Sequence, residues 1–240
     1  MTTTAPAPAT RRVPTDPTRR TAFVAGIFYL ITFAASIPAV ALLGPVLDNP
    51  DYIISAGADT RVLWGCLLDV VNVLAAIGTA VTLFPVVKRQ NEGLALGFVT
   101  TRLMEAAVVM IGVVSLLAIV TLRQDMAGTD PASLVSTGKS LVAVRDWTLL
   151  LGPGLMPALN AVLLGSLMYR SRLVPRIIPT IGLVGAPLLL ASVIATFFGA
   201  FGQFSPAALF LALPVAAWEF SLGTWMVVKG FRPAPITSAA

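Results

Sequence analysis

Six long apolar stretches restrict what this chain of 240 residues can fold into. A helix needs about 20 predominantly apolar residues to cross the hydrocarbon core of a membrane. The stretches occupy residues 22–43, 62–87, 94–122, 147–168, 178–201 and 207–228. Only 11% of the residues are charged, against about 25% in soluble domains, so the chain has too few charges for a hydrated globular surface. The sequence therefore predicts an all-α, polytopic membrane bundle with six transmembrane helices.

The segments outside these stretches divide the chain into three parts. Residues 1–20 are rich in Thr, Ala and Pro and contain two arginine pairs, which predicts a disordered basic arm. Residues 21–230 make the transmembrane domain, and residues 231–240 make a short tail. A cleaved signal peptide is the alternative for the first stretch, because Ala39-Val40-Ala41 resembles a cleavage site. The stretch is longer than a usual signal core, however, and five more follow it.

Lysine and arginine divide unevenly between the two sets of alternating loops. Eleven lie on the side of the termini: Arg11, Arg12, Arg19, Arg20, Lys88, Arg89, Arg170, Arg172, Arg176, Lys229 and Arg232. Four lie on the opposite side, which holds the long loops 44–61 and 123–140: Arg61, Arg123, Lys139 and Arg145. Because cytoplasmic loops carry the excess of positive charge, both termini are predicted to be cytoplasmic and the membrane to be the plasma membrane. The basic face is expected to contact anionic lipid headgroups, and the net charge of +5 gives no support for nucleic-acid binding.

Missing residue types exclude several chemistries. The chain has no histidine, so a catalytic imidazole, a His-ligated metal and a Ser-His-Asp triad are excluded. Its one cysteine, Cys66, cannot form an intrachain disulfide or a multi-cysteine metal site. We therefore predict no catalytic residue, no metal and no cofactor, and we expect that the protein is not an enzyme.

Charged residues inside the apolar stretches are the candidate site. A charge at the centre of a spanning helix costs about 2.5–3.5 kcal/mol on insertion scales, so such residues usually face a partner or water. Arg102 and Glu105 lie three apart on one helix face, and Glu219 lies in the last stretch. Counting about 1.5 Å per residue from the cytoplasmic ends places Arg102, Glu105, Glu219 and Asn160 at depths of roughly 12, 16, 14 and 12 Å. The sequence predicts a cluster near the midplane in which Arg102 is shared between both glutamates, with Asn160 as a neighbour.

Two interpretations of this cluster remain open. With all three charges ionised the cluster carries a net charge of −1, which is unfavourable in a low dielectric unless a carboxyl is protonated or a cation or water enters. That argument favours a proton or cation site. The alternative is a structural pin that fixes the helix register.

A second polar layer is expected nearer the outer face. Asp69 and Asn72 share one face of the second stretch, and Arg145 and Asp146 directly precede the fourth, so an Asp69–Arg145 pair is predicted there. Within the fourth stretch, Gly152-Pro153-Gly154 makes it the best candidate for a broken or hinged helix, with a static kink as the alternative.

Three segments together resemble a bacterial six-helix membrane family known as domain of unknown function 4386. They are the opening Arg20-x-Ala22-x-x-Ala25-Gly26-x-x-Tyr29-Leu30, the Arg102-x-x-Glu105 pair, and the ending Glu219-x-x-x-Gly223-x-Trp225-x-x-x-Lys229-Gly230-Phe231. The resemblance covers almost everything between Arg19 and Pro233 and implies a multi-pass bacterial membrane protein. It implies no activity. The open functions are a proton- or cation-coupled binding or transport module and, as the alternative, a non-catalytic membrane scaffold or accessory subunit, whose protein partner or homo-oligomer the sequence does not identify.

Overall fold

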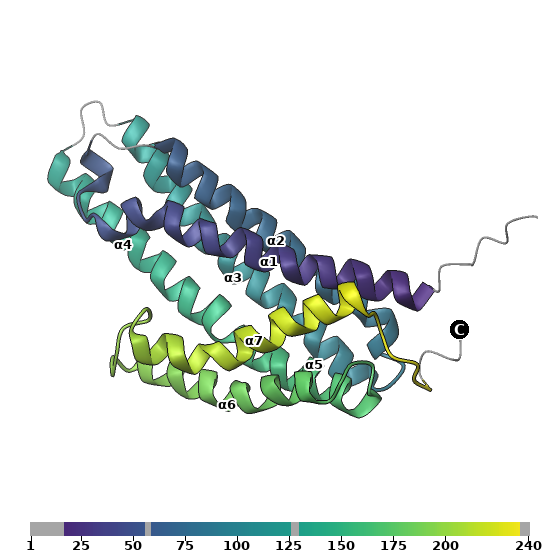
Figure 1. The fold of residues 1–240 in the computed structure, drawn as a ribbon. Helices are drawn as coiled ribbons and strands as arrows, with labels where there is room; N and C mark the ends of the chain where they lie inside the picture. The colour runs from purple at the N-terminus through teal and green to yellow at the C-terminus, as the bar shows by residue number, and fades with distance from the viewer. Residues whose placement is uncertain (1–16, 56–58, 126–129, 236–240) are drawn as a thin grey trace, which may run out of the picture.

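The computed structural model describes residues 17–55, 59–125 and 130–235, and the regular elements in these ranges are all helices. The elements in chain order are α1 (Pro17–Asp48), the short 3₁₀ helix η1 (Tyr52–Ile54), α2 (Asp59–Val87), α3 (Glu92–Gln124), α4 (Pro131–Leu149), the π-helical turn η2 (Leu150–Gly154), α5 (Met156–Ser171), α6 (Ile177–Phe197) and α7 (Pro206–Val228) (Figure 1). Residues 1–16 of the predicted disordered arm and residues 236–240 of the predicted tail lie outside the described residues.

Six helical segments are long and apolar enough to cross a membrane, since α4, η2 and α5 form one segment from Pro131 to Ser171. This confirms the predicted all-α bundle and identifies an integral membrane protein. Large apolar side chains face outward along these segments; Ile37 is 67% exposed and Phe210 is 72% exposed. Such a surface is suited to contact with lipid rather than water.

Several predicted boundaries were wrong. Residues 131–140 are helical instead of forming part of a loop, because Asp130 caps α4 by accepting a hydrogen bond from the Ser133 amide at 3.0 Å and Pro131 is at the first helical position. Residues 44–48 belong to α1, which also begins at Pro17 and so includes residues placed in the basic arm. Helix α6 ends at Phe197, four residues before the predicted end of its stretch.

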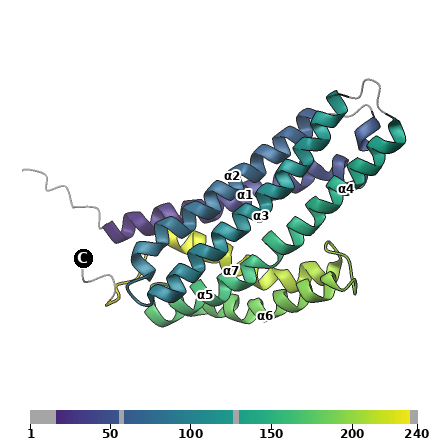
Figure 2. The same ribbon diagram turned by 180° about the vertical axis from the view of Figure 1, so that it is seen from behind.

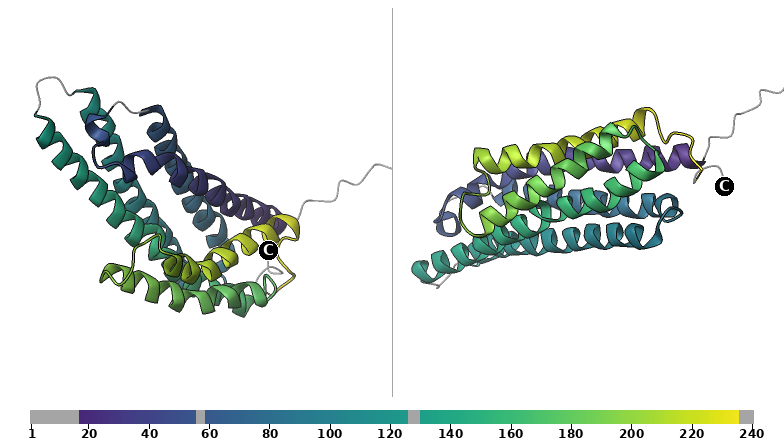
Figure 3. Two further views of the ribbon diagram at one scale, coloured as in Figure 1. Left: turned by 60° about the vertical axis from the view of Figure 1, so that its left-hand side comes forward. Right: turned by 90° about the horizontal axis from the view of Figure 1, so that it is seen from below.

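The α-helix is interrupted at Gly152, Pro153 and Gly154, as predicted. Pro153 has no backbone N–H to donate, and the chain makes a π-helical turn there before α5 begins. Figures 1 and 2 show that α4 leans away from the α6–α7 hairpin, whereas α5 packs close to it. The left-hand view in Figure 3 shows the same divergence at the end of the bundle opposite the termini, and the right-hand view looks along it from below. The break therefore changes which helices the chain can contact on either side of it.

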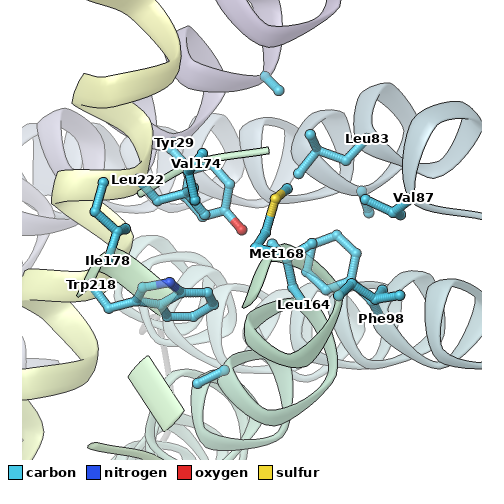
Figure 4. Packing of buried hydrophobic residues seen from close by; sticks show 14 of the residues in the cluster. Tyr29, Leu83, Val87, Phe98, Leu164, Met168, Val174, Ile178, Trp218 and Leu222 are labelled. Atoms are coloured by element: carbon cyan, nitrogen blue, oxygen red, sulfur yellow. The ribbon is translucent and has the colours of Figure 1, made fainter. Parts of the chain in front are cut away.

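Helices α1 and α7 cross at two glycines. A Cβ atom added to Gly26 would lie 2.7 Å from the Gly223 carbonyl oxygen and 2.9 Å from the Val227 amide nitrogen. Close approach of this kind is typical of helix contacts in membranes, where small residues let backbones pack directly. Below this crossing, Met168 lies between Tyr29, Leu83 and Phe98 in the buried core (Figure 4).

Replacing Gly26 by alanine is expected to lower the free energy of unfolding by about 1–3 kcal/mol, because the added methyl group meets backbone atoms that cannot rotate away. A suitable measurement is unfolding of the purified protein in detergent by increasing dodecyl sulfate, followed by circular dichroism. Gly44→Ala on the same helix is the control, since its Cβ would meet nothing closer than 3.4 Å. Equal stability of the two variants would contradict this account of the crossing.

Both described ends of the chain lie at one end of the bundle (Figure 1). Arg19, near the start of α1, donates to the Met226, Val227 and Val228 carbonyl oxygens at 3.1 Å each. A cation is favourable at a helix C-terminus because the last carbonyls have no partner within the helix. Arg19 therefore ties the first helix to the last at this end.

Candidate functional site: a charged cluster beside a cavity

Arg102 joins the two glutamates as predicted. Its Nη1 donates to the Glu105 Oε2 at 3.0 Å within α3, and its Nη2 donates to the Glu219 Oε1 on α7. The Arg102 side chain is 3% exposed, and each glutamate side chain is 12% exposed. The contact between α3 and α7 is made by charged groups in the interior of the bundle.

Asn160 completes the cluster from α5. Its Nδ2 donates to the Glu105 Oε2 at 3.0 Å, and its Oδ1 accepts a hydrogen bond from the Thr101 hydroxyl. Glu105 is thus held by an arginine and an amide. Among the described residues, Arg102 is the only donor to Glu219. The two carboxylates therefore differ: Glu105 is fixed by its neighbours, and Glu219 is held on one side only.

Two aromatic rings enclose the arginine. The Arg102 Cζ lies 5.3 Å from the centre of the Tyr29 ring and 5.9 Å from that of Phe98. A guanidinium over an aromatic face gains a cation–π attraction that strengthens when water is excluded. Neither Tyr29 nor Thr101 was a predicted site residue. Tyr29 did stand in the opening motif and Thr101 precedes Arg102, but composition and depth alone gave neither a role.

A cavity of ≈ 270 Å³ lies beside Glu219, and we call it the α6–α7 cavity. Helix α7 lines it with one continuous stripe: Ala208, Leu209, Ala212, Val215, Ala216 and Glu219. Helix α6 lines it with a second stripe: Leu189, Ser192, Val193 and Thr196. The broken segment contributes Leu150, Pro153, Gly154 and Pro157, and Gln203 and Phe204 extend the cavity to the α6–α7 loop. The cluster is therefore not sealed, because one of its carboxylates faces this cavity.

The predicted outer pair is also present, and it is buried inside the bundle. The Arg145 Nη2 on α4 donates to the Asp69 Oδ2 on α2 at 2.6 Å, and the two side chains are 4% and 7% exposed. Both line a second cavity of ≈ 180 Å³ together with Asn72. This cavity shares Leu149 and Pro153 with the α6–α7 cavity, so the helix break separates the two.

Asp146 does not join this layer. It is exposed on α4 and faces a different cavity, lined also by Asn49 and Lys139. Arg145 and Asp146 were predicted to precede the fourth helix, but both lie inside α4 because that helix begins at Pro131. Successive helical residues point in different directions, which separates Asp146 from Arg145.

A third polar contact lies at the end of the bundle away from the termini, where Tyr52, outside the spanning helices, meets the ends of α2 and α3. The Tyr52 hydroxyl in η1 donates to the Asp59 Oδ1 at 3.3 Å, Arg123 forms an ion pair with Asp59 at 2.9 Å, and its guanidinium lies 4.4 Å from the Tyr52 ring centre. Burial raises the pKa of Tyr52 above its ordinary value, and Arg123 opposes this effect.

This shift predicts an alkaline dependence. Because the folded state holds the Tyr52 proton more tightly than the unfolded chain, its contribution to stability is complete below about pH 10. That contribution is lost as the pH rises from there through the folded pKa. Tyrosinate absorbance is measured against pH for the wild type and for Tyr52→Phe, and the difference between the two curves reports the titration of Tyr52. We expect the midpoint of this difference to lie above pH 10. A midpoint at or below 10 would contradict the burial argument.

The described residues contain no group of three or more acidic, histidine or cysteine side chains that could hold a metal ion. A carboxylate that accepts hydrogen bonds from arginine and amide groups, as here, is chemically able to take up a proton or to pair with a cation.

Comparison with known proteins gives one match. A family model described as a domain of unknown function (DUF4386) matches residues 24–230. No curated protein and no solved structure matches the chain. The matched range contains the charged cluster and every described residue that lines the α6–α7 cavity.

Proposed function

This chain belongs to the family of the domain of unknown function DUF4386, and from that premise we propose that it is a binding or transport module that uses Glu219 to exchange a proton or a cation. The family name assigns no activity, so the proposal depends on the site. It involves no catalytic residue and no cofactor.

One observation carries the proposal: Glu219 is paired with Arg102 and also lines the α6–α7 cavity. A carboxylate with a single described donor, beside open space, can gain or lose a partner without unfolding of the bundle. The three charges sum to −1 when all are ionised, and this excess is unfavourable in an interior of low dielectric. A proton or cation that reaches Glu219 from the cavity neutralises it.

We further propose that both termini lie in the cytoplasm of a bacterial cell and that the bundle spans its plasma membrane. The support is the distribution of charge, since the described lysines and arginines near the chain ends and in the α2–α3 and α5–α6 connections gather at one end of the bundle. These residues would contact anionic lipid headgroups. In this orientation the α6–α7 loop and its end of the cavity face outward.

The test is proton flux in vesicles reconstituted with purified protein, with a pH-sensitive dye inside and an imposed membrane potential. We expect wild-type protein to pass protons faster than empty vesicles, and Glu219→Gln to abolish the excess. Glu92→Gln is the matched control, because Glu92 is exposed at the start of α3. Flux at the wild-type rate in a folded Glu219→Gln variant, or no excess flux in the wild type, would overturn the transport proposal.

A second candidate function is supported by the enclosure of Arg102. Its guanidinium contacts groups from α1, α3 and α7, and Glu105 extends the network to Asn160 on α5. A network of this kind can fix helix register, which is what a non-catalytic scaffold or accessory subunit requires. This function predicts a stable protein partner on purification in mild detergent, together with no flux.

A further inference from the structure

The walls of the α6–α7 cavity are mostly apolar. Leucine, valine, alanine, proline and phenylalanine side chains make most of the surface, and Ser192, Thr196 and Gln203 are the neutral polar residues among those described. Its volume of ≈ 270 Å³ is just below the range of about 300–1,000 Å³ typical of ligand sites. The cavity can thus enclose the hydrocarbon part of a small molecule.

A single ionisable group lines this apolar space among the described residues, and it is Glu219. It lies thirteen positions after Pro206, where α7 begins, so about 20 Å of helix separates it from the α6–α7 loop. The lining of the cavity therefore extends from Gln203 and Phe204 at the loop to a carboxylate about four turns along α7.

This arrangement discriminates between ligand classes. Small metal cations need several oxygen ligands to replace their hydration shell, and the apolar walls do not provide them around Glu219. An anion would face the carboxylate directly, and a purely apolar molecule would gain nothing from it. An ammonium group on an apolar body matches both features, because its charge pairs with Glu219 and its body buries apolar wall surface.

We propose that the α6–α7 cavity binds a small amphipathic organic amine, with its ammonium group at Glu219 and its apolar body between α6, α7 and the broken segment η2. This inference rests on the proposed function and specifies its ligand class. The ammonium group brings the net charge of the Arg102, Glu105 and Glu219 cluster from −1 to zero. It also shares Glu219 with Arg102, which is why a moderate affinity is expected.

The experiment measures binding of 4-phenylbutylamine to the purified protein in detergent by isothermal titration calorimetry, with 4-phenylbutan-1-ol as the uncharged analogue of similar shape. We expect the amine to bind and the alcohol to bind at least about tenfold more weakly, since the alcohol cannot make the charged hydrogen bond. Glu219→Gln should weaken binding of the amine by a similar factor and leave the affinity for the alcohol unchanged.

A second variant separates occupation of the cavity from charge. Ala212→Phe places a ring in the stripe that lines the cavity, whereas Ala217→Phe places the same ring on the exposed face of α7. Binding should be lost in the first variant and retained in the second. Circular dichroism and size-exclusion chromatography establish that each variant is folded.

Three outcomes would overturn the inference. Absence of amine binding by the wild type would reject the ligand class, and equal affinity for the amine in Glu219→Gln would reject the assigned carboxylate. Equal affinity for the alcohol would indicate an apolar occupant such as a lipid chain. Proton flux that depends on Glu219 without amine binding would leave the proposed function standing with a different ligand. Amine binding that depends on Glu219 without flux would reject transport and retain the site.

Discussion

In detergent-purified protein, Arg102→Met is expected to lower the free energy of unfolding by about 3–5 kcal/mol. The substitution keeps much of the side-chain bulk and removes the cation that contacts Glu105 and Glu219. Both carboxylates then remain in the interior without a counter-charge, and the contacts with the Tyr29 and Phe98 rings are weakened. Unfolding by dodecyl sulfate, followed by circular dichroism, measures the loss.

The triple variant Arg102→Met, Glu105→Gln, Glu219→Gln tests the reason for this effect. Neutral groups of similar size remove the unpaired charges, so most of the lost stability should return. Arg170→Met controls for the loss of an arginine as such; Arg170 is exposed at the end of α5, and its change should stay within about 0.5 kcal/mol. If the triple variant is no more stable than Arg102→Met, unpaired charge is not the cause.

Arg145→Met is expected to lower the free energy of unfolding by a comparable amount, about 3–5 kcal/mol, because it leaves Asp69 buried without its partner. Adding Asp69→Asn should restore part of the loss, and the two single variants with the double variant give the coupling energy of the pair. Lys139→Met on the exposed face of α4 serves as the control. The same dodecyl sulfate titration applies.

The number of unpaired carboxylates ranks the two variants. Arg102→Met leaves Glu105 and Glu219 without a counter-charge, whereas Arg145→Met leaves Asp69 alone. Both sites line a cavity that water can enter, so Arg145→Met should lower the free energy of unfolding by no more than Arg102→Met does. A larger loss for Arg145→Met would show that burial of Asp69, whose side chain is 7% exposed against 12% for each glutamate, outweighs the number of unpaired charges.

Much of this site followed from the sequence. The apolar stretches were long enough to identify six spans, and counting residues from their ends placed Arg102, Glu105, Glu219 and Asn160 at one depth. The apolar stretches contain few charged residues, and Arg102 is the only cation in them at the depth counted for the two glutamates. Pairing of Arg102 with both glutamates was therefore expected. The Gly152-Pro153-Gly154 sequence marked the position where the helix breaks.

Rotation of each helix about its own axis was not predictable. In a soluble protein the apolar face of a helix identifies the core, but lipid is also apolar, so residues that face the lipid and residues that face the core look alike. On α7, Leu213 is 59% exposed and Leu222 is fully buried. Nothing in their chemistry distinguishes them.

The sequence alone therefore determined the fold class, the number of candidate spans and the pairing of Arg102 with Glu105 and Glu219, because these depend on the length of apolar runs and on the cost of burying charge. The tertiary structure alone decided that Tyr29 covers Arg102, that Asp146 is apart from Arg145, and that Glu219 rather than Glu105 faces the cavity. These features depend on which helix faces meet, and packing between apolar surfaces sets that choice.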